Sequence, residues 1–381
     1  MITRFQYKYP FKDFIYSLNK INSNRNSFKD LETYFDLKQV YFAIQARVSL
    51  RLVLNSLNLK KNAVIGVQAY NCINVFESIQ IAGYRPLFID VNENYVLDNH
   101  DLSNKADRID ALILNHTFGI PADIDKIRTI CKNKPIIEDC AHSLFSTYQD
   151  KPTGTFCDAS IFSIGYAKYP SIGKGGFALL NNQELKDNYE KEHFLLKDQS
   201  LLNEMKNVFK NYFMAFANKP PYYNFFFYPL GKLIDKKVNI TDKFGHKESK
   251  GFNSNACLLE HNFREYLALN EKQRANGKKL VTLLKDAISC VDDTDEKKIN
   301  FYIFPLRSTN RDEIVSSLYK KGMECGKHFS NSLRIAKKFG YRDNMCPNSE
   351  KIVKEIFTIP SNYSLTDNQI ELIVKNLKGV L

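Results

Sequence analysis

The chain has 381 residues, a length that favours two domains, because single domains usually run to roughly 100–200 residues. Hydrophobic residues make up 44% and charged residues 25%, and 28 Phe and 21 Tyr provide large apolar faces, so a globular protein with a sizeable core is expected. The net charge of +12 is spread in pairs such as Lys60-Lys61 and Lys297-Lys298 without a long basic block, which favours a solvated surface or an anionic small molecule over nucleic acid as partner.

The chain start and the cysteines bear on the compartment. Residues 1–10 lack the uninterrupted apolar stretch of a signal peptide, and no later segment approaches the ~20 apolar residues of a membrane span. The eight cysteines form neither a C-x-x-C pair nor a Cys/His cluster with metal-ligand spacing. We therefore expect a cytoplasmic protein with reduced, mostly buried thiols, no metal site and no membrane span.

From about residue 40 to 180, short β-branched runs alternate with amphipathic stretches, which is typical of βαβ units. Val75, Phe76 and Ile79 predict a helix that ends at Gly83, and Pro121 predicts the start of another. The predicted strands are Ala63–Val67, Pro86–Asp90, Ala111–Leu114, Pro135–Asp139, Ala159–Ser163 and Gly176–Leu180. The fold class expected is α/β, with a mostly parallel sheet and helices on both faces.

The pattern changes in the second half of the chain. Residues from about 184 to 245 are mostly helical and contain the aromatic run 222–229, which favours core or subunit-interface packing over a membrane anchor. A long amphipathic helix from Leu258 to Leu284 precedes a strand at Phe301–Leu306 and further helices. These features predict a large domain over 1–250 and a smaller α+β domain over 251–381.

Three segments of the predicted large domain carry chemistry. Asp139 closes an apolar strand, the turn Ser163–Lys168 delivers a lysine amine, and Gly173–Gly176 allows close backbone approach. Taken singly, the carboxylate is typical of a helix cap or salt bridge, the lysine of a solvated side chain, and the glycines of a turn. Together they match pyridoxal phosphate (PLP), which needs a lysine for its Schiff base, an acid at its ring nitrogen and donors for its phosphate.

The segment Ile137–Ser143 reads Ile-Glu-Asp-Cys-Ala-His-Ser and resembles a motif of the DegT/StrS sugar aminotransferases, PLP enzymes of fold type I. The similarity extends over roughly residues 30 to 380 and includes Gly83–Val91, Gly119–Asp123 and Gly154–Ala159. It implies the large and small domains of fold type I.

The resemblance also implies roles for single residues. Lys168 would hold the cofactor as a Schiff base and shuttle a proton between the substrate carbon and the cofactor. Asp139 would pair with the pyridine nitrogen, His142 would lie against the ring or its phenolic oxygen, and Ser163 would donate to the phosphate. Asn253 would reach the phosphate from the neighbouring subunit, which implies a homodimer with shared active sites.

Two of the departures from the family pattern concern the cofactor. Gln45, Ala46 and Arg47 stand where the family has Ser-Gly-Thr at the start of a helix, and backbone N–H groups of Ala46 and Arg47, together with the guanidinium, remain able to bind phosphate. Cys72 stands where the family often has Phe or Trp, which leaves Tyr70, or no residue, to stack on the ring.

The implied function is transfer of an amino group, usually from glutamate, to a keto-sugar linked to a nucleotide, in surface polysaccharide or glycan biosynthesis. One alternative is a PLP-dependent sugar dehydratase of the same fold, in which histidine replaces the cofactor lysine, so Lys168 argues against it. Another is a non-catalytic relative that binds a membrane or a partner, against which Asp139, Ser163 and Lys168 argue together.

Overall fold

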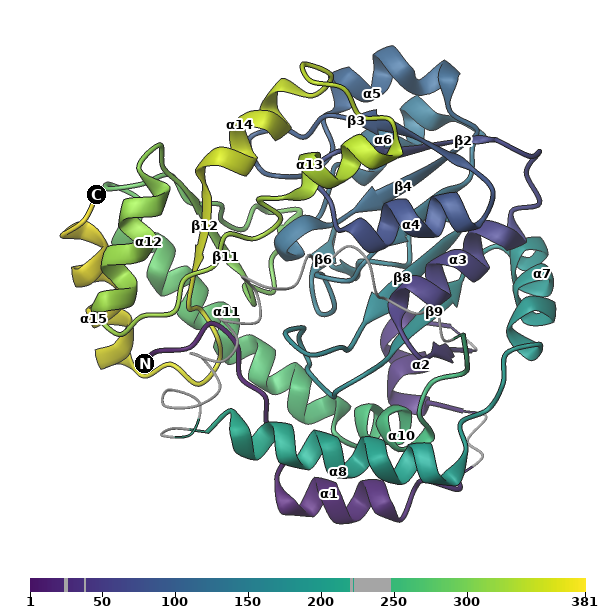
Figure 1. The fold of residues 1–381 in the computed structure, drawn as a ribbon, viewed down its shortest axis with the longest axis horizontal. Coiled ribbons are helices and arrows are strands. Elements are labelled where there is room, and N and C mark those ends of the chain that lie inside the picture. The colour runs from purple at the N-terminus through teal and green to yellow at the C-terminus, as the bar shows by residue number, and fades with distance from the viewer. Residues whose placement is uncertain (24–26, 38, 220–221, 223–247) are drawn as a thin grey trace.

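The structure, a computed structural model, describes residues 1–23, 27–37, 39–219, 222 and 248–381. At its centre lies a seven-stranded sheet with the order β1-β9-β8-β5-β4-β2-β3 (Figure 1). Its strands are β1 (Tyr41–Ala43), β2 (Val64–Gln68), β3 (Arg85–Ile89), β4 (Ala111–Asn115), β5 (Ile136–Asp139), β8 (Ala159–Ser163) and β9 (Gly176–Leu180). Each predicted strand of the large domain is present, two of them with the predicted bounds.

Most of this sheet is parallel. Strands β3, β2, β4, β5 and β8 run in one direction, while β9 is antiparallel to β8 and β1 is antiparallel to β9. All five residues of β4 and of β9 are buried, as expected for strands covered by helices on both faces. The prediction of an α/β fold with a mostly parallel sheet is therefore confirmed.

Alternate residues of each strand enter two separate cores. Ile113 and Ile137 pack with α3 (Ala46–Ser56), α4 (Ile73–Ile81) and α7 (Gln183–Phe194). On the other face, Leu112 and Ile136 pack with α5 (Asn99–Lys105) and α6 (Ile124–Cys131). Short 3₁₀ turns lie at Ala106–Arg108, Thr117–Gly119 and Lys337–Phe339.

The C-terminal part of the chain, from Phe263 onward, packs as a group of helices and strands beside the central sheet (Figure 1). Its strands β11 (Phe304–Arg307) and β12 (Ile356–Ile359) pair antiparallel. Its helices are α11 (Phe263–Leu284), α12 (Arg311–Lys320), α13 (Ser332–Ala336), α14 (Pro347–Glu355) and α15 (Asp367–Lys378). A small sheet joins the two parts, because β10 (Lys297–Lys298) pairs with β6 (Thr147–Tyr148), which pairs with β7 (Lys151–Pro152). The N-terminal Ile2 bridges Met323, so the chain start lies against this C-terminal part.

Four further helices lie below the sheet in Figure 1: α1 (Phe11–Leu18), α2 (Lys29–Phe35), α8 (Leu201–Ala217) and α10 (Asn253–His261). Helix α8 packs on α1 and α10. The predicted helical segment 184–245 contains α7 and α8, but residues 220–221 and 223–247 lie outside the described residues, and with them all of the aromatic run except Tyr222. No helix in the described ranges is long and apolar enough to cross a membrane.

Several predicted bounds were wrong. The long helix expected over 258–284 is interrupted at Asn262, whose side-chain amide donates to Asp13 Oδ2 at 3.1 Å. Helix α6 begins at Ile124 instead of Pro121. Strand β11 begins at Phe304, because Phe301 has a left-handed backbone with φ 52° and turns the chain. The domain boundary at 250/251 stays a prediction.

Candidate active site

A pocket opens beyond the carboxyl ends of β4, β5 and β8, the place where parallel α/β sheets bind ligands. Most predicted site residues line it: Ala46, Arg47, Cys72, Asp139, His142, Ser163 and Lys168. Other lining residues were not predicted to bind the cofactor: Asn71, Asn74, Asn115, His116, Thr117 and Phe329. The helix, strand-end and turn residues proposed for one cofactor therefore share one cavity.

Asp139 is fixed by the strand next to it. It ends β5 in parallel register with Asn115 at the end of β4, and Asn115 Nδ2 donates to Asp139 Oδ2 at 2.6 Å. The other carboxylate oxygen accepts from the backbone N–H of Ala141 at 3.0 Å. Burial raises the pKa of Asp139, and the Ala141 N–H group and Lys168 act in the opposite direction. A carboxylate held in this way can accept a hydrogen bond from a protonated ring nitrogen.

Lys168 lies in the turn after β8. Its backbone N–H donates to Gly165 O at 3.1 Å, and Ile172 N–H donates back to Ile164 O at 3.0 Å, so the turn closes on itself. Burial lowers the pKa of the Lys168 amine, while Cys72 and Asp139 raise it. Because only the neutral amine is a nucleophile, burial favours attack on a carbonyl.

Helix α8 supports this turn from outside. Tyr166 OH donates to Asn211 Oδ1 at 2.8 Å, and Asn211 Nδ2 donates to Ile172 O at 3.1 Å. A Cβ atom added to Gly173 would lie 2.2 Å from Asn211 Oδ1, so glycine is required there. The glycine run thus allows α8 to approach the lysine turn.

His142 packs against two aromatic rings. Its ring is nearly parallel to Phe118 (13°) and to Phe329 (14°), with centroids 6.2 and 5.6 Å away. Its Nδ1 accepts from the Phe118 N–H at 3.2 Å, and burial lowers its pKa well below the ordinary value. A neutral imidazole with Nδ1 as acceptor carries its proton on Nε2, which is then available as a donor.

The first turn of α3 lines the same pocket as Asp139. Gln45 precedes the helix without a side-chain cap, and Arg47 Nε donates to Gln45 Oε1 at 2.7 Å while Arg47 NH1 donates to Asn74 Oδ1 at 3.1 Å. Ser163 ends β8 on the same pocket. A helix N-terminus, a guanidinium and a hydroxyl form a donor set suited to a phosphate.

Two predicted residues do not line the pocket. Tyr70 is fully buried beside Phe118 and Phe329, and its OH donates to His328 O at 2.7 Å. Asn253 begins α10 and lines a separate groove with Phe42 and other residues. Their roles toward the cofactor stay predictions.

Gly176 offers a test of the phosphate end. A Cβ atom on Gly176 would lie 2.3 Å from the backbone nitrogen of Ala46, so Gly176→Ala must push the start of α3 outward. Overpacking of this kind costs about 1–3 kcal/mol, and we expect the affinity for PLP to fall about tenfold, measured by titration of the apoprotein. Gly379→Ala is the matched control, since the nearest atom would lie at 3.4 Å. Equal PLP affinity of the two variants would exclude α3 from phosphate binding.

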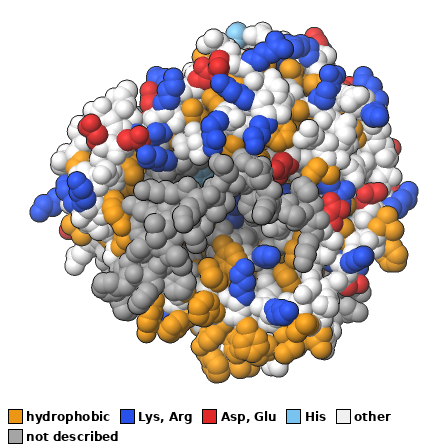
Figure 2. All heavy atoms as spheres, viewed as in Figure 1, with side chains coloured by type: hydrophobic (Ala, Val, Ile, Leu, Met, Phe, Trp, Pro, Cys, Tyr) orange, Lys and Arg blue, Asp and Glu red, His pale blue; other side chains and the backbone are white. Residues whose placement is uncertain are grey.

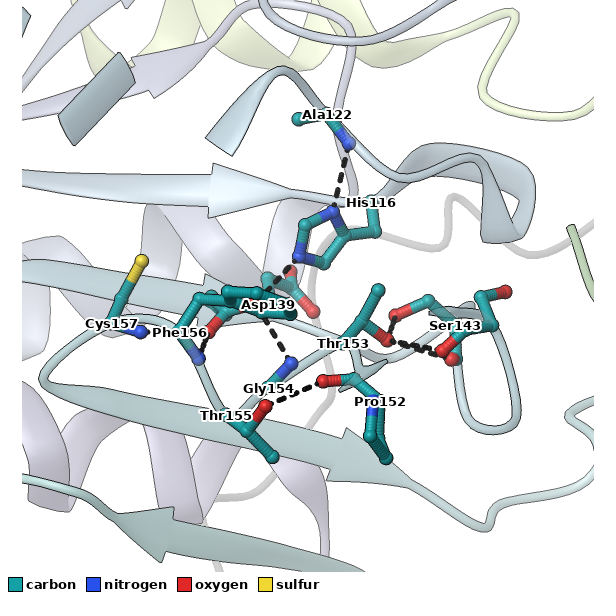
Figure 3. A network of polar contacts seen from close by, with 12 residues as sticks. His116, Ala122, Asp139, Ser143, Pro152, Thr153, Gly154, Thr155, Phe156 and Cys157 are labelled. Atoms are coloured by element: carbon teal, nitrogen blue, oxygen red, sulfur yellow. Dashed lines mark hydrogen bonds and ion pairs between the residues drawn. The ribbon is translucent and has the colours of Figure 1, made fainter. Parts of the chain in front are cut away.

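A buried network behind the pocket was also missed. Glu138 Oε2 accepts from His116 Nε2 at 2.9 Å and from Gly154 N–H at 2.8 Å, and its Oε1 accepts from the N–H groups of Phe156 and Cys157 at 2.9 and 3.0 Å. His116 Nδ1 accepts from Ala122 N–H at 3.1 Å, so the ring donates through Nε2 (Figure 3).

His116, Glu138 and Cys140 bring possible metal-ligand atoms within 4.8 Å of one another. The hydrogen bonds to Glu138 and His116 already occupy both carboxylate oxygens and both ring nitrogens, which makes this a structural clamp between β5 and the loop at 154–157.

A sheet of this order, with a buried lysine, a carboxylate and a helix N-terminus around one pocket, defines a PLP-dependent transferase of fold type I. The chain belongs to the DegT/DnrJ/EryC1/StrS aminotransferase family, whose sequence profile matches residues 29–378. The predicted family, its enzyme class of aminotransferase and its cofactor PLP are thereby confirmed.

Individual relatives agree with this assignment. The chain is 30% identical to GDP-perosamine synthase of Escherichia coli O157:H7 over 175 residues, which cover 44% of this chain and 48%, about half, of that enzyme. Among solved structures it is similar to the sugar aminotransferase CalS13 from Micromonospora echinospora, with a TM-score of 0.79, 17% identity and 100% of both chains covered. It is also similar to the putative sugar aminotransferase Spr1654 from Streptococcus pneumoniae in its PMP form, with a TM-score of 0.78, 16% identity and 98% of both chains covered.

Proposed function

We propose that this chain transfers an amino group from glutamate to a nucleotide-linked keto-sugar, as a step in surface polysaccharide or glycan biosynthesis. The observation that carries the proposal is the placement of Lys168 and Asp139 in one buried pocket beside the start of α3. The name of the relative GDP-perosamine synthase supports a nucleotide-linked sugar as substrate.

Each pocket residue has a role in the reaction that follows from its position. PLP, when bound, supplies an electron sink for the carbon that gains or loses the amino group. Ala46, Arg47 and Ser163 hold the phosphate, and Asp139 keeps a proton on the ring nitrogen. Lys168 Nζ then carries a proton from the reacting carbon of the amino donor to the cofactor, and from the cofactor to the sugar carbon in the second half of the reaction, a task that suits an amine whose pKa is lowered by burial.

The proposal extends to the assembly and the compartment. Asn253 faces a groove of its own with Phe42 and Lys250, which supports its role as a phosphate contact to the neighbouring subunit of a homodimer. A cytoplasmic location fits a substrate made from nucleotides.

Glutamate alone tests the donor half of the reaction. We expect the purified yellow protein to lose its visible PLP absorbance on addition of glutamate and to release about one 2-oxoglutarate per site, because a transaminase completes this half without the sugar. Lys168→Ala, as the control, should release no detectable 2-oxoglutarate over the time in which the wild type completes the reaction. Absence of the spectral change with glutamate would contradict the proposed donor, and absence with every common amino acid would contradict amino transfer itself.

A further inference from the structure

Helix α8 presents an apolar stripe outward. The stripe consists of Leu202, Met205, Phe209, Tyr212, Phe213 and Phe216, which are 36–59% exposed. At 100° per residue, these six side chains fall within an arc of about 100°. Phe11 and Ile15 of the adjacent α1 extend the stripe, at 61% and 41% exposed. Figure 2 shows apolar side chains gathered at the lower edge of the molecule, where Figure 1 places α1 and α8.

The inward face of α8 is polar and fixed. Glu204 Oε2 accepts from Ser254 Oγ at 2.6 Å, and Asn207 Nδ2 donates to Asn255 Oδ1 at 2.9 Å. Asn211 holds the lysine turn, as described above. Rotation of α8 to bury its phenylalanines would break these buried hydrogen bonds, each of which costs about 1–3 kcal/mol when a partner is left unsatisfied. The outward apolar stripe is therefore a stable property of the folded chain.

The charge around the stripe is positive. Lys206, Lys210 and Lys219 are exposed on α8 and just after its end. The acidic residues of α1 and α8, two helices that are described throughout, are Asp13 and Glu204, and both are buried at 4% and 1% exposure. Aromatic and aliphatic side chains bordered by lysines are typical of helices that lie in the interface of an anionic membrane, where the lysine amines reach lipid phosphates.

A second copy of this chain is the alternative partner for the stripe. Glu204 Oε1 accepts from the Asn253 backbone N–H at 2.6 Å on the inward side of α8, and the groove that Asn253 lines contains no residue of the stripe. A dimer that shares sites through Asn253 would thus use a different face. The lysines that border the stripe complement an anionic lipid surface but would face the same lysines on a second copy, so the charge favours the lipid surface.

We propose that the α1–α8 stripe docks the enzyme on anionic phospholipid, with Phe11, Phe209, Phe213 and Phe216 in the acyl boundary and Lys206 and Lys210 at the headgroups. The docking is peripheral and reversible, and leaves the active-site pocket intact.

Because the chain contains no tryptophan, a single introduced one reports on its own surroundings. Phe213→Trp is expected to show a blue shift with phosphatidylglycerol vesicles, to show little with phosphatidylcholine vesicles, and to lose the shift in 1 M salt, where the Debye length is about 3 Å. Leu372→Trp on α15, 45% exposed and outside the stripe, should show no shift. An unchanged Phe213→Trp spectrum, or equal shifts with both lipids, would overturn the proposal.

Vesicle sedimentation gives the second measurement. The double change Phe209→Glu and Phe213→Glu should lower the partition coefficient at least about tenfold, since one tenfold step is about 1.4 kcal/mol and each buried Phe contributes more than that. Leu372→Glu should leave it unchanged. Retained PLP absorbance shows that the variants are folded. Conversion of a dimer to a monomer by the double change, without vesicle binding by the wild type, would assign the stripe to a second copy instead.

Discussion

Replacement of Lys168 with alanine should lower transamination at least about a thousand-fold. The amine has two tasks, since it holds the cofactor covalently and transfers the substrate proton, and proton transfer by a positioned side chain alone contributes about 10²–10⁴ in rate. Burial, which lowers its pKa, suits it to both tasks. The measurement is single-turnover release of 2-oxoglutarate from glutamate with PLP added in excess, so that weaker cofactor binding does not hide the chemical effect.

Lys60→Ala serves as the control, because the Lys60 side chain is 77% exposed and does not line the pocket. It should retain full activity. If Lys168→Ala keeps more than a tenth of the wild-type rate with PLP in excess, another group carries the proton and the assignment of Lys168 fails.

Replacement of Glu138 with alanine should destabilise the fold by at least about 3 kcal/mol, because each buried donor left without an acceptor costs about 1–3 kcal/mol. The side chain is fully buried and accepts four hydrogen bonds, three of them from backbone N–H groups of the loop at 154–157. Without the carboxylate these donors have no acceptor, and the end of β5 that carries Asp139 loses its clamp. The check is the urea midpoint of unfolding.

Glu184→Ala is the matched control, since Glu184 is exposed on the first turn of α7 and surface changes usually stay within about 0.5 kcal/mol. Equal midpoints for the two variants would show that the network around Glu138 contributes no net stability. A loss of activity without a change in midpoint would instead point to a direct role in the chemistry.

The sheet could be predicted because its signal is local. Strand β9 (Gly-Phe-Ala-Leu-Leu) lies between Gly175 and Asn181, strand β8 (Ala-Ser-Ile-Phe-Ser) follows Asp158, and the predicted bounds of both match the structure. The helix break at Asn262 could not be predicted from the sequence, because the hydrogen-bond partner of Asn262, Asp13, lies 249 residues away in the chain. The early start predicted for β11 failed for a similar reason, since Phe301 packs against Gly277 of α11, where a Cβ would lie 2.3 Å from its ring.

In the site too, residues with a local sequence signal could be predicted, whereas residues placed by long-range contacts could not. Asp139 and Lys168 follow strands with clear patterns, so their common pocket was predictable from the topology of parallel strands. Asn115 could be placed beside Asp139 only once the register of β4 on β5 was known. Phe329 comes from the C-terminal part and reaches His142 through the packing of the two parts. Polar residues at 204, 207 and 211 follow helical spacing and would suggest a solvent face, whereas these positions are buried and the phenylalanines are exposed.

Borohydride reduction followed by peptide mass mapping tests the central assignment most directly. Reduction fixes PLP on the lysine that holds it, and the account predicts that the added mass is found on the peptide with Lys168, at about one per chain, and is absent from Lys168→Ala. Label on a different lysine, or no label on a protein that has taken up PLP, would contradict the account.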